Sequence, residues 1–299
     1  MNQISRRDFT KLSVAGSVAI AAAPAAKAQK PKTDVWVFHG DNQRALMEKC
    51  METIFANGGF GIEKGKKIAL KVNAAWERTP EQRANTNPDM VDVFLEKTLA
   101  AGYKVGMAEL PCHRAVKSFP ACGIEDVAKK YRIKLLDLAT ERNPWKEIAI
   151  PGGIKLQTEN VAKEFLEADA IVNMPVAKHH GGGVLTICMK NWMGAVEGRK
   201  NWHGLGLHDC IADFSTFIKP TWAIVDAFEC MTSKGPQGPS PDMIYPHQII
   251  LSKDQVAADT VTTLLFHDSQ YKIKYLEIAR ERGIGETDIN NMNIHRIEV

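Results

Sequence analysis

The five residues Ala170-Ile171-Val172-Asn173-Met174 decide the fold class. They form a continuous, largely apolar run without alternation, which is typical of a strand buried on both faces of a parallel sheet. Ala223–Asp226 and Gln248–Ser252 have the same character. Because such runs alternate with longer helical patterns, we predict an α/β fold with a mostly parallel sheet and helices on both faces, in a single compact domain.

The spacing of apolar residues predicts the remaining elements around this strand. Further strands are expected at Val35–Phe38, Ile68–Val72, Val105–Leu110 and Lys134–Leu138, with a small hairpin at Lys146–Ile150 and Gly153–Leu156. Helices are expected from Pro88 onward and at Gln43–Phe55, Ile124–Tyr131, Leu185–Val196, Asp209–Ile218, Gln255–Phe266 and Tyr271–Arg282.

The N-terminal 28 residues are predicted to be an export signal. Arg6, Arg7 and Lys11 precede an apolar stretch from Ser13 to Ala23 and a small-x-small site at Ala26–Ala28. The paired arginines resemble the twin-arginine signal, although an ordinary export signal or an amphipathic helix are alternatives. We therefore expect residues 1–28 to be removed by processing, a mature chain of residues 29–299, the twin-arginine translocase as a partner, and a periplasmic location. The apolar stretch is shorter than a membrane span, so no stable membrane anchor is expected.

The balance of charges excludes one class of partner. The chain has 299 residues and a formal charge of +3, with 44% hydrophobic and 24% charged residues. These fractions are ordinary for a folded domain. Removal of residues 1–28 removes the whole excess, which leaves a mature chain with zero formal charge. We therefore expect no nucleic acid as a partner, and an anionic ligand would need a local cluster of cations.

The six cysteines show no metal-binding spacing. No Cys-x-x-Cys occurs, so a [4Fe-4S] cluster is not expected in this chain. Cys188 and Cys230 lie in apolar runs and are predicted to be small buried hydrophobic residues. Cys112 and Cys122 lie at the two ends of a loop. They could form a disulfide bond with each other or bind a ligand. A signal of the twin-arginine type raises the expectation of a cofactor without naming one.

Polar side chains follow several of the predicted strands. Lys71 and Asn73 end one strand, Glu109 ends the next, and Asp226 ends a later one. Ligands of open α/β sheets bind beyond the carboxyl ends of the strands. We therefore expect these side chains to face one site.

The densest polar segment runs from Lys178 to His208. It contains Lys178, Lys190 and Asn191, together with the triple glycine Gly181–Gly183. Glycine amides before a helix that begins near Val184 would suit an anion, and Lys178, Lys190 and Arg199 would add charge for a carboxylate or phosphate. A solvated surface loop is the alternative. The predicted anion-binding residues are Lys71, Asn73, Gly181, Gly182, Gly183, Asn191 and Asp226.

The histidines of this segment have three interpretations. His179, His180, His203 and His208 could ligate a transition metal, together with Asp209 or Asp213. One of them could instead transfer a proton, or they could be loop residues. The predicted catalytic residues are His179, His203, Lys178 and Lys190.

Three features nearby have simpler interpretations. Gly235–Pro239 is predicted to be a rigid turn or a lid. Asp254 is predicted to be a helix N-cap, while Asp259 in the same helix is a candidate buried acid facing the pocket. Trp192 and Trp202 are predicted to be packing residues.

As an ordered set, these motifs resemble the family of proteins with the domain of unknown function DUF362. The resemblance extends from about Lys71 to Gly283. It is carried by Lys71-Val72-Asn73, Asn87-Pro88, Val172–His179, Thr186–Gly194, Trp202-His203, Ile224–Ala227, Gly235–Pro239, Ser252–Asp254 and Ala257–Asp259. It implies redox-associated relatives, many with an appended four-cysteine ferredoxin segment that this chain lacks. It also implies a layout distantly similar to nickel-dependent lactate racemases.

Three hypotheses follow for the function. The first is an enzyme acting on a small anionic substrate, a carboxylate or a phosphate, at the carboxyl edge of the strands. The second is a metal- or iron–sulfur-associated redox accessory protein with a redox partner protein. The third is a non-enzymatic anion-binding module, which would be stabilised by its ligand without turnover.

Overall fold

The computed structural model describes residues 31–266 and 273–299. The predicted export signal, its cleavage site and the first residues of the predicted helix at Tyr271–Arg282 lie outside this part. Residues Lys32–Val299 form one compact unit. No helix among the described residues is long and apolar enough to cross a membrane.

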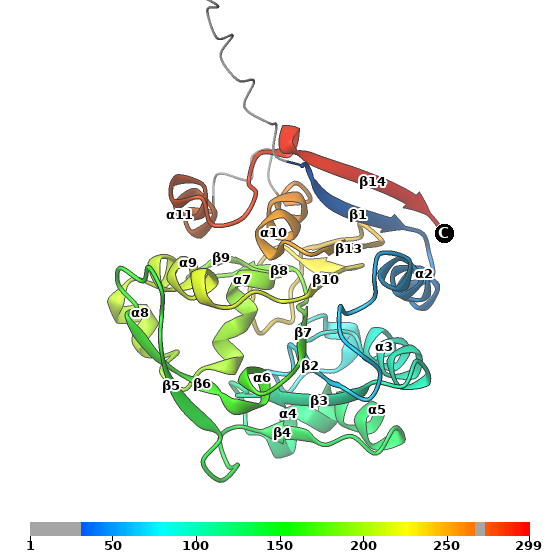
Figure 1. Cartoon of the computed structure of the whole chain (residues 1–299), viewed down its shortest axis with the longest axis horizontal. Coiled ribbons are helices and arrows are strands. Elements are labelled where there is room, and N and C mark those ends of the chain that lie inside the picture. The colour runs from blue at the N-terminus through cyan, green and yellow to red at the C-terminus, as the bar shows by residue number, and fades with distance from the viewer. Residues whose placement is uncertain (1–30, 267–272) are drawn as a thin grey trace, which may run out of the picture. The chain divides into compact units, whose positions relative to one another are not determined.

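An eight-stranded sheet forms the centre of this unit (Figure 1). One strand, β13, runs antiparallel to both of its neighbours, and the other neighbouring pairs are parallel. The prediction of a mostly parallel sheet is confirmed. In spatial order the strands are β14 (Met292–Glu298), β1 (Thr33–His39), β13 (Gln248–Ser252), β10 (Trp222–Ala227), β7 (Ala170–Met174), β2 (Lys67–Val72), β3 (Lys104–Glu109) and β4 (Leu135–Asp137).

Helices cover both faces of the sheet, as the continuous apolar strands predict. In β2, Ile68, Leu70 and Val72 pack into one hydrophobic core, whereas Ala69 packs into the other. The first core is closed by α2 (Gln43–Ala56), α3 (Pro88–Ala100), α4 (Ala115–Ala121) and α5 (Ile124–Lys130). The second is closed by α6 (Lys163–Leu166), α7 (Cys188–Asn191), α9 (Leu207–Phe217), α10 (Gln255–Thr263) and α11 (Lys274–Arg282) (Figure 1).

Two predicted helix starts are confirmed by their caps. The Asn87 side chain accepts a hydrogen bond from the Asp89 amide at 2.8 Å, and Pro88 occupies the first helical position of α3. Asp254 accepts hydrogen bonds from Val256 and Ala257 at the start of α10. Trp192 and Trp202 are buried packing residues, as predicted.

In the described part of the chain, three short pairs of antiparallel strands lie outside the main sheet. They are β5 (Trp145–Ala149) with β6 (Thr158–Ala162), β8 (Lys178–His180) with β9 (Val184–Thr186), and β11 (Cys230–Met231) with β12 (Met243–Ile244). The predicted return strand at Gly153–Leu156 is wrong. The amides of residues 154–156 donate to Asp213 rather than to a neighbouring strand.

The predicted helix at Leu185–Val196 is also wrong in its first part. Val184–Thr186 is the second strand of the β8–β9 hairpin, and α7 begins only at Cys188. A short 3₁₀ segment, η2 (Trp192–Ala195), follows α7 directly, and the next helix is α8 (Asn201–Leu205). The triple glycine therefore forms a hairpin turn and does not lead into a helix.

Asp213 links three segments that are far apart in the sequence. Its carboxylate accepts three backbone amides of the loop after β5 and the guanidinium of Arg282 on α11. Burial alone would raise the pKa of Asp213, but the amide of Leu156 and Arg282 outweigh it and hold that pKa below its ordinary value.

Replacing Asp213 by alanine should lower the free energy of unfolding by about 2 kcal/mol, because these donors lose a charged acceptor. Asp209→Ala on the same helix is the matched control and should change it by less than about 0.5 kcal/mol. Urea unfolding measures both variants, and equal effects would contradict a special role for Asp213.

Candidate functional site

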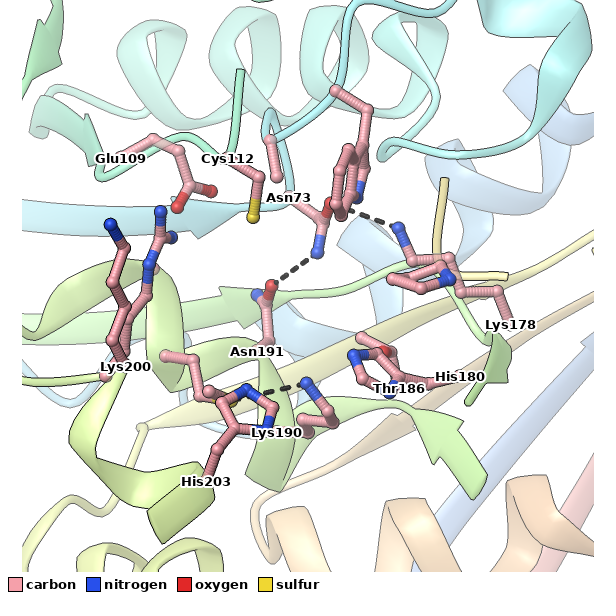
Figure 2. Close-up of a pocket in the computed structure, with 16 residues that line it drawn as sticks. Asn73, Glu109, Cys112, Lys178, His180, Thr186, Lys190, Asn191, Lys200 and His203 are labelled. Atoms are coloured by element: carbon pink, nitrogen blue, oxygen red, sulfur yellow. Dashed lines mark hydrogen bonds between the residues drawn. The ribbon is translucent and has the colours of Figure 1, made fainter. Parts of the chain in front are cut away.

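A cavity of about 290 Å³ lies at the carboxyl ends of β2, β3 and β7. We call it the site pocket (Figure 2). Its volume is at the lower end of the range for small-molecule sites. The polar side chains that line it are Asn73, Glu109, Cys112, Lys178, His180, Thr186, Lys190, Asn191, Arg199, Lys200 and His203.

Lys178 lies in the pocket wall and has no carboxylate partner among the described residues. It begins β8, directly after the loop that leaves β7, and its side chain is 1% exposed. Its Nζ donates to the carbonyl oxygen of Ala84 and, at 3.3 Å, to Oδ1 of Asn73. Burial lowers the pKa of Lys178 to about 7, so both protonation states are populated near neutral pH.

Lys190 is the second buried lysine of the site pocket. It is held on α7, and its Nζ donates to the thioether sulfur of Met193 at 3.2 Å. A thioether is a weak acceptor, so most of the hydrogen-bonding capacity of the ammonium remains for a ligand. Burial lowers the pKa of Lys190 to about 8, and the group is mostly charged at pH 7.

A chain of asparagine amides fixes α7 against the central strands. Asn73 Nδ2 donates to Asn191 Oδ1 at 3.1 Å (Figure 2). Asn191 Nδ2 donates to Asn173 Oδ1 at 2.9 Å. Asn173 Nδ2 in turn donates to the carbonyl oxygen of Cys188. The predicted residues Asn73 and Asn191 therefore lie together in the pocket wall and hold each other in place.

Lys71 lies behind the site pocket and does not line it. Its Nζ contacts Glu109 Oε2 at 2.9 Å, and both side chains are buried. Glu109 also accepts the Ala74 amide at 3.1 Å. Burial opposes both charges, so it lowers the pKa of Lys71 and raises that of Glu109. Glu109 lines the pocket, but its negative charge is balanced by the Lys71 ammonium.

Gly194 leaves the room that this pair needs. A Cβ atom at that position would lie 1.7 Å from Glu109 Oε1 and 2.8 Å from Lys71 Nζ. A side chain there would displace the pair, so this glycine is required by close approach.

The amides of the triple glycine are largely engaged within the hairpin. The Gly182 and Gly183 amides both donate to His180 Nδ1 at 3.0 Å. Burial lowers the pKa of His180 to about 3, which keeps its ring neutral and able to accept these bonds. None of the three glycines lines the site pocket as the structure describes it.

The four histidines of the segment separate. His180 and His203 line the site pocket, and His203 is exposed at its mouth (Figure 2). His179 lies beside the Gly235–Pro239 loop, where its Nδ1 accepts the Gly235 amide. His208 stacks on Tyr275. Within residues 31–266 and 273–299, no three His, Cys, Asp or Glu side chains come together to hold a metal ion.

Two predicted acids lie outside the site pocket. Asp226 is 1% exposed and accepts hydrogen bonds from Gln43 and from the Asn87 and Phe228 amides. Asp259 is buried as predicted, but it accepts the Cys188 and Met189 amides at the start of α7. Burial raises the pKa of Asp259 to about 7. Both carboxylates hold elements together and do not face the pocket.

The cysteines show no pairing in the described part of the chain. All six are free thiols. Cys188 and Cys230 are buried, as predicted, and so is Cys122. Cys112 is exposed and lines the site pocket.

Two pocket features could not be found from the sequence. The carbonyl of Ala84, which accepts Lys178, carries no side-chain signal. Thr186 lines the pocket with a buried Oγ1 that has no hydrogen-bond partner among the described residues.

Arg199 belongs to the dense polar segment and also lines the pocket. Its guanidinium donates to the carbonyl oxygens of Leu110 and Pro111, and these bonds hold its charge beside the pocket.

Comparison with known proteins gives one family and two distant similarities. The family described as "Domain of unknown function (DUF362)" matches residues 68–263. The thylakoid-associated protein sll1697 of Synechocystis sp. is 22% identical over 257 residues, which cover 81% of this chain and 76% of that protein. The lactate racemase apoprotein of Thermoanaerobacterium thermosaccharolyticum has 13% identity and a TM-score of 0.38 over 63% of this chain. The present chain spans about half the length of that racemase, with 49% of it covered.

Proposed function

The chain belongs to the DUF362 family, and we propose that it is an enzyme that binds a small organic anion in the site pocket and transfers a proton on it. The observation that carries the proposal is the pair of buried lysines, Lys178 and Lys190, neither of which has a carboxylate partner in the described structure. A buried cation without a counter-ion is costly, and a bound anion removes that cost.

The charges around the pocket favour an anion over a neutral ligand. Lys190 and Arg199 contribute positive charge, and Lys200 lies at the rim. The carboxylate that lines the pocket, Glu109, is already paired with Lys71. The small volume favours a compact carboxylate or phosphate, which the lysines can bind through charge-assisted hydrogen bonds.

The proposed division of roles follows from the partners of each group. Lys190, mostly protonated at pH 7, binds the anion. Lys178, with a pKa of about 7, accepts or returns a proton near neutral pH. His203 lines the pocket mouth and is the second candidate for proton transfer. Asn73 orients Lys178 through its side-chain oxygen and is itself held in place by Asn191.

Binding is tested by thermal shift with lactate, pyruvate, phosphate and sulfate as separate ligands. A ligand at about 100 times its Kd should stabilise the chain by about 2.7 kcal/mol. Lys190→Gln should weaken that ligand at least about tenfold, because it removes the charge that faces the anion. Lys104→Gln, at an exposed position on β3, is the matched control and should leave binding unchanged.

The chemistry is tested by solvent exchange. The bound acid is incubated in D₂O, and NMR follows deuterium uptake at the carbon next to its carboxyl or carbonyl group. Uptake that is lost in Lys178→Met or His203→Gln supports an enzyme. Stabilisation without uptake or turnover would instead assign the chain to the class of anion-binding modules.

A further inference from the structure

Lys178 and Lys190 differ in a way that assigns them different tasks. A neutral amine has two N–H donors and one lone pair, whereas an ammonium has three donors and none. Lys178 Nζ has two oxygen acceptors, Ala84 O and Asn73 Oδ1, and the described residues supply no third. This number of partners matches a neutral amine whose lone pair is free.

Lys190 has the opposite arrangement. Its Nζ is buried and has the Met193 sulfur as its partner in the described chain. Two of the three donors of its ammonium are therefore available for a carboxylate, and the third is held only by this weak acceptor. The site pocket thus combines a candidate nucleophilic amine with a separate cation for an acid group.

Thr186 supplies an independent sign of a ligand. Its side chain is 4% exposed, lies in the pocket wall, and has no hydrogen-bond partner for Oγ1 in the described structure (Figure 2). A buried hydroxyl without a partner costs free energy, and an oxygen of a bound molecule would remove that cost. This hydroxyl belongs to the strand β9, opposite Lys178 in the β8–β9 pairing.

We propose that Lys178 forms a Schiff base with the carbonyl carbon of a 2-oxo acid whose carboxylate is bound by Lys190. The inference rests on the proposed function and specifies its substrate class. A compact 2-oxo acid carries its carbonyl directly beside its carboxylate, which matches two amines lining one small cavity. Thr186 donates a hydrogen bond to an oxygen of the substrate.

The reaction is an addition followed by loss of water. The lone pair of the neutral Lys178 Nζ attacks the carbonyl carbon, and the carbonyl oxygen takes up a proton to give a carbinolamine. The nitrogen loses a proton, the hydroxyl group leaves as water after protonation, and a C=N bond remains. His203 at the pocket mouth can supply and recover these protons. The sequence of steps needs no oxidant or reductant.

The test is reductive trapping in the unaltered chain. Pyruvate and sodium cyanoborohydride are added near pH 7, and peptide mass spectrometry locates the reduced adduct. We expect the adduct at Lys178 at a level at least about tenfold above any other lysine, because ordinary lysines are almost fully protonated at this pH. Excess lactate, which has the carboxylate but a hydroxyl group in place of the keto group, should compete and give no adduct.

Variants separate this inference from the proposed function. Lys190→Gln should reduce trapping at Lys178 at least about tenfold at low pyruvate, and high pyruvate should restore it. Lys104→Gln should have no effect. Stabilisation by pyruvate without an adduct at Lys178, or equal labelling of exposed lysines, would overturn the Schiff base and leave anion binding intact. Failure of every acid to stabilise the chain would overturn the proposed function itself. Site mapping in the unaltered chain keeps the test decisive even where Lys178→Met fails to fold.

Discussion

Replacing Lys71 by methionine should lower the free energy of unfolding by about 3–5 kcal/mol, because it leaves the carboxyl group of Glu109 buried without its cation. Lys71 and Glu109 are 0% and 1% exposed at their side chains, and their Nζ and Oε2 atoms are 2.9 Å apart. Methionine has a similar length and keeps the packing, so the loss of unfolding free energy measures mainly the missing positive charge beside Glu109. Urea unfolding with an unchanged slope is the measurement.

The same substitution on the same strand provides the control. Lys67 also pairs with a glutamate, Glu164, at 2.8 Å, but the Lys67 side chain is 36% exposed. Lys67→Met should cost less than about 1 kcal/mol. The double variant Lys71→Met with Glu109→Leu should recover most of the lost stability, because no buried charge remains. Similar losses for Lys67→Met and Lys71→Met would contradict this account.

Lys178 should be the most reactive lysine among the described residues toward a small electrophile at neutral pH. With a pKa of about 7, half of its side chains are neutral at pH 7. An ordinary lysine, with a pKa of about 10.4, has about 10³-fold less neutral amine there. Cyanate is small and adds to neutral amines, so we expect carbamoylation at Lys178 ahead of the exposed lysines. Peptide mass spectrometry at short times measures the order.

The pH dependence distinguishes a lowered pKa from mere accessibility. Labelling of Lys178 should rise with pH through about 7 and then level off, because the amine is fully neutral above its pKa. Labelling of an amine with an ordinary lysine pKa should continue to rise toward pH 10. A titration of the Lys178 ¹³Cε chemical shift gives the same midpoint without any reagent. A midpoint near 10 would contradict the neutral-amine interpretation.

The sequence alone was sufficient to predict the strands that are buried on both faces. Ala170–Met174 and Ile68–Val72 are continuous apolar runs, and a run of this kind has few alternatives in an α/β chain. The strand β14 was missed because Met292–Glu298 has one buried residue and mixed polarity. Edge strands carry a weak pattern, and their place in a sheet is decided by tertiary pairing.

The hairpin at the triple glycine shows where local sequence was ambiguous. Glycines before Val184-Leu185 fit both a helix start and a turn, and Val184 adopts a φ of 62° that is rare for a β-branched residue. The pairing of β8 with β9 decided the outcome. The dense segment did predict the two pocket lysines. It could not show that the amides of Gly182 and Gly183 donate to His180, because these hydrogen bonds depend on how the hairpin folds.

The position of β1 in the sheet determines when the fold can be completed. Val35–His39 pair on one side with Gln248–Ser252, and Thr33–His39 pair on the other side with Met292–Glu298. Both partners are therefore made more than 200 residues after β1. At about 5–20 residues per second, a ribosome needs on the order of 10–50 s to reach them. During that interval β1 has neither of its partners, so the sheet closes only around a nearly finished chain, and folding is a late, non-local event.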